Sequence, residues 1–242
     1  MSIAPARRLA EAASCWLHHE YLCLRAGLFD EAALKFVIGQ VLSSFPSDKP
    51  ARVWSGVDHP VLADYATNRK PEIDFALCDL AGNDRGDIRV AVEVKWADSG
   101  HCTPRNIMSD VWRLCVLAGY LKDKQVDADC ILVIAGTKGK IKEMIRKRPF
   151  IGLGSLPTAS GRQKIIYPEV FGAGGKDGWR DLFMANKNKD KAMREAYDFI
   201  SVPKIGVTFH AGIPAINLTG DSTRSSDSAV KFHAMAWSIQ SL

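Results

Sequence analysis

The chain has 242 residues, of which 47% are hydrophobic and 24% are charged. This length and composition are typical of a globular protein with a substantial core, and they exclude a disordered or fibrous chain. The net charge of +5 suits a polyanionic partner only mildly, because many basic proteins bind no nucleic acid.

The six cysteines are scattered along the chain, and they form neither a C-x-x-C pair nor a zinc-finger spacing with histidine. The sequence contains no secretory signal peptide and no apolar run of about 18 residues. We therefore expect free thiols, a cytoplasmic location and no membrane partner.

Two helices and a strand are expected in the first quarter of the chain. Residues 5–26 and 30–44 are the expected helices, and residues 52–57 are the strand. Asp30 is a favourable N-cap for the second helix. Glu31 follows it and falls on the inward stripe of that helix, where a carboxylate also suits the helix dipole.

A β-hairpin is expected next. Residues 72–79 and 88–96 alternate apolar and polar side chains, and the linker between them is rich in turn formers. Side chains two apart on a strand share a face, so Glu93 and Lys95 project together and Asp74 can lie beside them. Two carboxylates and an amine can bind a hard divalent cation and handle a water molecule.

The setting of this hairpin decides whether the charged triplet has a function. On an edge hairpin, Glu93 and Lys95 would lie in water and need no explanation. On a central strand the same pair would be buried, and burying charges needs a reason.

The remaining elements are predicted from apolar runs and glycine-rich breaks. They are a helix over 106–122, a strand over 130–135, a basic helix over 138–148, glycine-rich loops over 150–161 and 171–178, a helix within 178–200, and strands near 204–210 and 229–239. Asp110 and Arg113, three apart on the 106–122 helix, are most simply a surface ion pair. The alternative is that a polar residue of this helix faces the site.

A helix with an inward glutamate, a hairpin with Asp and then Glu-x-Lys, a helix and an apolar strand together resemble the PD-(D/E)XK nuclease superfamily. That superfamily includes many type II restriction enzymes, Holliday-junction resolvases and repair nucleases. The resemblance covers roughly residues 30–136. It implies an α/β fold of the restriction-endonuclease-like type, with an α-β-β-β-α-β core and a central mixed sheet flanked by helices.

The resemblance also implies a division of the chain. An N-terminal helix (1–28) precedes the nuclease core (29–136), and a C-terminal α+β elaboration (137–242) is expected to belong to the same domain.

Site residues are carried over from the family motif position by position. The resemblance makes Asp74 and Glu93 the metal-binding carboxylates, and Lys95 the lysine that orients or deprotonates the attacking water. The carbonyl of Val94 would be a third protein ligand. Glu31 matches the glutamate that many members place on the first core helix. The metal implied is Mg²⁺, for which Mn²⁺ can substitute.

One departure from the family pattern leaves a choice open. The family's proline and aspartate are often adjacent, whereas here Pro71 is followed by Glu72 and Asp74 comes two residues later. Glu72 and Asp74 share a strand face, so either could be the ligand. We prefer Asp74, which lies deeper in the apolar alternation.

The resemblance implies a Mg²⁺-dependent endodeoxyribonuclease that acts in restriction, phage defence or a mobile element. DNA is then the expected partner, together with a second copy in a homodimer or proteins of the same system. Two alternatives stay open. The chain could be a nuclease-fold subunit that binds nucleic acid or a protein without cutting, or a metal-free domain that binds a small anion through its glycine-rich loops.

The basic residues of the 138–148 helix fit the nuclease hypothesis. Lys138, Lys140, Arg146 and Lys147 could contact the phosphate backbone of DNA. The simpler interpretation is a solvated helix face.

Overall fold

The computed structural model of the chain describes residues 4–65, 70–82, 84–147, 162–166, 204–212 and 232–242. In chain order the elements are α1 (Pro5–Leu22), η1 (Ala26–Leu28), α2 (Glu31–Ser43), β1 (Ala51–Asp58), η2 (Leu62–Tyr65), β2 (Glu72–Ala81), β3 (Asp84–Trp96), α3 (Pro104–Asp123), β4 (Asp129–Thr137), α4 (Lys138–Ile145), β5 (Arg162–Ile166), β6 (Ile205–Ala211) and β7 (Phe232–Ser241). The helix expected within 178–200 and the glycine-rich segments 150–161 and 171–178 lie outside the described residues.

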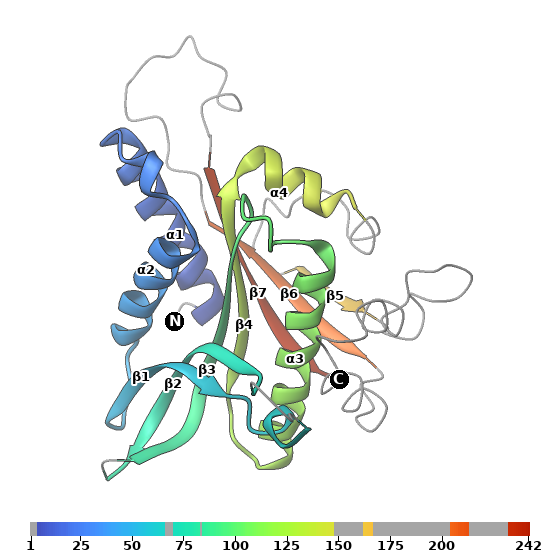
Figure 1. The fold of residues 1–242 in the computed structure, drawn as a ribbon. Coiled ribbons are helices and arrows are strands. Elements are labelled where there is room, and N and C mark those ends of the chain that lie inside the picture. The colour runs from blue at the N-terminus through green and yellow to red at the C-terminus, as the bar shows by residue number, and fades with distance from the viewer. Residues whose placement is uncertain (1–3, 66–69, 83, 148–161, 167–203, 213–231) are drawn as a thin grey trace, which may run out of the picture.

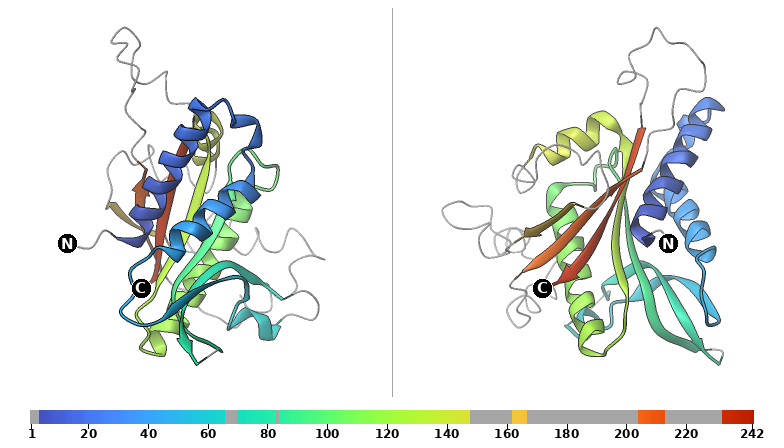
Figure 2. Two further views of the ribbon diagram at one scale, coloured as in Figure 1. Left: turned by 90° about the vertical axis from the view of Figure 1, so that its left-hand side faces the viewer. Right: turned by 180° about the vertical axis from the view of Figure 1, so that it is seen from behind.

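The described strands form one sheet in the order β1-β2-β3-β4-β7-β6-β5 (Figure 1). Strands β3 and β4 are parallel, and the other neighbours pair antiparallel. Helices α1 and α2 cover one face, and α3 covers the other (Figure 2). The structure thus confirms an α/β fold with a mixed sheet flanked by helices.

The β2–β3 hairpin is longer than the sequence predicts. Both strands continue into the linker 79–87, and the chain reverses at Gly82, whose φ of 67° glycine adopts without strain. Turn-forming residues therefore lie inside strands here. The prediction of a loop over most of this linker was wrong, because pairing between the strands overrides local turn preference.

Other boundaries also differ. The first helix ends at Leu22 instead of residue 26, and Leu24 then adopts a positive φ of 61°. Strand β5 (Arg162–Ile166) had no sequence prediction. The two late strands were expected, and pairing of β7 with β4 joins them to the sheet of the first half.

Strands β3 and β4 lie at the centre of the sheet, with strands on both sides of each. Their middle residues are buried, as expected for a sheet covered by helices on both faces. Of the helices that the structure describes, none has both the length and the apolar composition required to cross a membrane.

Candidate functional site

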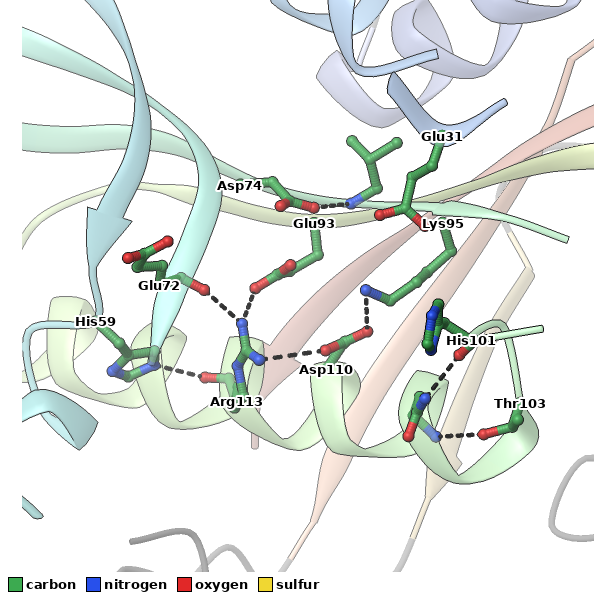
Figure 3. Close-up of polar contacts among 12 residues, drawn as sticks. Glu31, His59, Glu72, Asp74, Glu93, Lys95, His101, Thr103, Asp110 and Arg113 are labelled. Carbon is green, nitrogen blue, oxygen red and sulfur yellow. Dashed lines mark hydrogen bonds and ion pairs between the residues drawn. The ribbon is translucent and has the colours of Figure 1, made fainter. Parts of the chain in front are cut away.

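Glu93 brings a carboxyl group into the central part of the sheet. It lies on β3, and only 3% of the residue is exposed. An isolated buried carboxylate is very costly, so it needs a partner. Arg113 of α3 supplies it: its Nη2 atom bonds Glu93 Oε1 and also donates to the backbone carbonyl of Glu72 at 2.6 Å (Figure 3).

Lys95 follows two residues later and extends toward the same helix. Its Nζ atom lies 3.1 Å from Oδ2 of Asp110, and Oδ1 of Asp110 lies 3.4 Å from Nη1 of Arg113. Glu93 and Lys95 therefore lie inside the protein, between β3 and α3. The alternative of a solvent-facing edge hairpin was wrong for this strand.

The same contacts correct the expectation for α3. Asp110 and Arg113 are not a surface ion pair, since their side chains are only 5% and 19% exposed and both face β3. Their spacing of three residues places them on one helix face, as predicted. Which face is buried depends on how α3 packs on the sheet, and the spacing carries no such information.

Asp74 meets this group where the two strands of the hairpin part. Phe75 and Val92 are the last paired residues of β2 and β3 toward this end. Beyond them, Oδ2 of Asp74 accepts a hydrogen bond of 2.9 Å from the backbone N–H of Val94. A side chain of β2 thus replaces its backbone as the partner of β3, which brings the Asp74 carboxylate close to Glu93.

Helix α2 adds a cation that sequence reasoning missed. Lys35 Nζ lies 2.8 Å from Oδ1 of Asp74 and 3.1 Å from Oε1 of Glu31. The helix is close to β2 because Gly39, one turn after Lys35, has no side chain. A Cβ at position 39 would lie 3.3 Å from the ring of Phe75.

Burial and neighbouring charges together raise the pKa values of both Glu93 and Lys95, for different reasons. Burial raises the pKa of Glu93 above that of an ordinary carboxyl, while the guanidinium of Arg113 favours the ionised form, and Asp110 and Asp74 raise the pKa further. Burial lowers the pKa of Lys95, but the carboxylates of Asp110, Glu93 and Asp74 outweigh it and raise that pKa above its usual range. Lys95 is therefore a cation at neutral pH.

The structure brings some of the site residues predicted from the sequence together and separates others. Asp74, Glu93 and Lys95 come together, and Glu31 joins them through Lys35. Glu72 turns its carboxylate toward Gly56 of β1 and offers its backbone carbonyl to Arg113. This geometry favours Asp74 over Glu72.

His59 contacts Arg113 through the backbone of α3. Its Nδ1 atom accepts hydrogen bonds from the backbone N–H groups of Val61 and Leu62, at 3.2 and 3.1 Å. The ring proton therefore lies on Nε2, which donates to the backbone carbonyl of Arg113 at 3.0 Å. Burial lowers the pKa of His59 to about 4, so the ring is neutral.

The basic helix α4 begins next to the C-terminal end of β3. Asp98 accepts hydrogen bonds from the backbone N–H and the Oγ1 of Thr137, both at 2.7 Å, and Thr137 caps α4. Lys140 and Lys147 are exposed and pair with Glu143 at 3.3 and 2.7 Å. Part of the charge of this helix is thus neutralised locally.

The donor chemistry suits a hard divalent cation. Within the described part of the chain, no group of three or more His, Cys, Asp or Glu side chains is placed to hold a metal. Mg²⁺, however, keeps several waters and often uses only one or two carboxylates. Asp74 and Glu93 can supply these, provided that Lys35 and Arg113 yield part of their contacts.

Comparisons of the chain with protein-family models, with curated proteins and with solved structures found no significant match.

His59 predicts a specific pH dependence of stability. An unfolded histidine titrates near pH 6.5, whereas folded His59 titrates near 4. The stability contributed by the neutral ring is therefore complete above about pH 6.5 and is lost as the pH falls toward 4. From about pH 7 to about pH 5 this amounts to about 2 kcal/mol.

His59→Asn isolates this contribution, because asparagine keeps an acceptor for the backbone N–H groups of Val61 and Leu62 and does not titrate. The stability difference between wild type and variant should shrink by about 2 kcal/mol over the same pH range, as measured by urea unfolding. A difference that stays constant with pH would contradict a buried neutral ring.

Proposed function

We propose that this chain is a Mg²⁺-dependent endodeoxyribonuclease of the PD-(D/E)XK type. The observation that carries the proposal is the meeting of Asp74, Glu93 and Lys95 where the β2–β3 hairpin parts. Burial of charged groups costs folding free energy. A purely structural role explains poorly why the chain would accept this cost. The order α2-β1-β2-β3-α3-β4, with β3 parallel to β4, also supports the family topology.

Each residue has a role in this chemistry. Asp74 and Glu93, with the Val94 carbonyl, would hold the cation, which would neutralise charge on the phosphate and lower the pKa of a bound water. Lys95 is kept protonated by Asp110, so it suits the role of orienting the attacking water better than that of removing its proton. Arg113 would position Glu93.

DNA is the substrate that we favour, and the basic side chains of α4 would contact its phosphate backbone. The helix starts beside the end of β3, and Lys140 within it and Arg146 and Lys147 just after it are exposed. A role in restriction, phage defence or a mobile element, and a homodimeric state, belong to the proposal through the family resemblance alone.

A nuclease-fold subunit that does not cut is the second candidate. Two observations favour it: Asp74 and Glu93 are each already paired with a cationic side chain, and no three-residue metal group is found among the described residues. Stabilisation of the purified protein by Mg²⁺ or Mn²⁺ separates the two candidates, because a structural ion-pair network has no need of a metal.

Cleavage should depend on the three central residues. We expect Asp74→Asn, Glu93→Gln and Lys95→Met each to lower the cleavage rate by about 100-fold or more, as loss of a metal ligand or of a group acting on the water does. The assay follows supercoiled plasmid and linear single-stranded DNA with Mg²⁺, Mn²⁺ or EDTA. Asp87→Asn, an exposed site on the same strand, is the control.

Circular dichroism must show that each variant is folded. Cleavage that persists at the wild-type rate in the folded variants, or in EDTA, would contradict the proposal.

The basic residues of α4 and of the two positions that follow it should contact phosphates. Replacing Lys140, Arg146 and Lys147 by Ala should weaken binding to all DNA sequences alike, since phosphate contacts carry no sequence information. The slope of log K against log salt should flatten by up to about three, one for each phosphate that no longer has a basic partner. Fluorescence anisotropy at several salt concentrations measures both. Unchanged affinity and slope would make this a solvated helix face.

A further inference from the structure

The two oxygens of the Asp74 carboxylate have different partners. Oδ2 accepts a hydrogen bond from the backbone N–H of Val94, which the sheet holds in place. Oδ1 instead pairs with a flexible side chain, the ammonium of Lys35 at 2.8 Å. Oδ1 is therefore the oxygen of Asp74 that no backbone group holds, and a cation that binds there takes the place of Lys35 and leaves the strand contact intact.

Lys35 is the cation of the site that can leave most easily. Its side chain is 32% exposed, against 17% for Lys95 and 19% for Arg113. Arg113 is further held by the carbonyl of Glu72, and Lys95 by Asp110. Lys35 extends from helix α2 and is the most solvent-exposed of the three cations, so a shift of its flexible side chain disturbs no strand.

Glu31 offers the displaced ammonium a second partner. It lies four residues before Lys35 on α2, and its Oε1 is 3.1 Å from Lys35 Nζ. Such a pair within one helix does not depend on β2. Lys35 can release Asp74 and still keep an ionic contact.

The charge balance points the same way. The ion-paired residues form two groups: Glu31, Lys35 and Asp74 in one, and Glu93, Arg113, Asp110 and Lys95 in the other. With every side chain ionised, the second group is neutral and the first carries one excess negative charge. The excess lies on the side where Asp74 is partly open to solvent.

We infer that the Lys35 ammonium acts as an internal stand-in for the divalent cation on Asp74 Oδ1, and that it moves to Glu31 when the cation binds. This rests on the proposed metal site. Lys35 is then a positioning residue: it keeps Asp74 oriented in the free protein and competes with the metal. Glu31 acts through Lys35.

Calorimetric titration of MgCl₂ and MnCl₂ into the purified protein tests the inference without DNA. Lys35→Gln removes the competing charge, and we expect the cation to bind about three- to tenfold more tightly, as expected for removal of one partly exposed ion pair. The metal-free variant should melt at a lower temperature. Lys35→Arg should bind as the wild type does, and Lys35→Met repeats the test with an apolar side chain.

Lys124→Gln is the matched control for net charge. This lysine follows the last turn of α3, over the ring of Tyr120, and within the described part of the chain it pairs with no group of the site. Its loss should leave cation affinity unchanged. Equal tightening in Lys124→Gln and Lys35→Gln would reduce the effect to overall charge and overturn the inference.

Glu31→Gln tests the second step. Alone, it should weaken cation binding about threefold, because the displaced ammonium loses its partner. In the Lys35→Gln background the weakening should be clearly smaller, since only the general attraction of the Glu31 charge is then lost. Equal weakening in both backgrounds would overturn its action through Lys35.

The outcomes separate this inference from the proposed function. No cation binding by the wild type or by any Lys35 variant would contradict the metal site and the nuclease proposal together. Binding of equal strength by wild type and Lys35→Gln would leave the nuclease proposal in place and overturn the competition by Lys35.

Discussion

The Glu93 carboxyl group is buried at the centre of the sheet, so the rest of the site must compensate its charge. A lone carboxylate in this position would be protonated or would destabilise the fold. Arg113 compensates it, and Asp110 and Lys95 extend the compensation along the face between β3 and α3. The position of α3 along the sheet is thereby linked to the chemistry of a single strand residue.

Arg113 is in turn held by groups that are not charged. The carbonyl of Glu72 accepts from its guanidinium, and neutral His59 donates to its backbone. The start of β2 and the turn between β1 and η2 therefore both contact Arg113 of α3. Such hydrogen bonds help to make the burial of an ion pair tolerable, although Nε of Arg113 has no hydrogen-bond partner among the described residues.

The other side of the site is less constrained. Where β2 and β3 part, the Asp74 carboxylate takes over a backbone contact and becomes reachable from α2. With every side chain ionised, the deep part of the site is charge-balanced, whereas the Asp74 side has a carboxylate in excess. The negative side is also the more accessible one, so a cation can enter there without disturbing the core.

Patterns of a few residues were sufficient to predict much of this protein. Alternation along β3 predicted that Glu93 and Lys95 share a face, because strand geometry has a period of two. Asp30 was recognised as an N-cap, and its side chain does accept from the N–H of Ala33. The apolar run of β4 predicted a strand buried on both faces. Each of these depends on neighbours in the chain.

Only the tertiary structure decided which charges meet. Lys35 and Asp74, Arg113 and Glu93, and His59 and Arg113 come from separate elements. A charged residue on an amphipathic helix shows the same local pattern whether it faces water or a buried partner. The order of strands and the close packing of α2 on Phe75 settle that difference, because Coulomb and desolvation energies depend on distances in space and on burial, not on spacing in sequence.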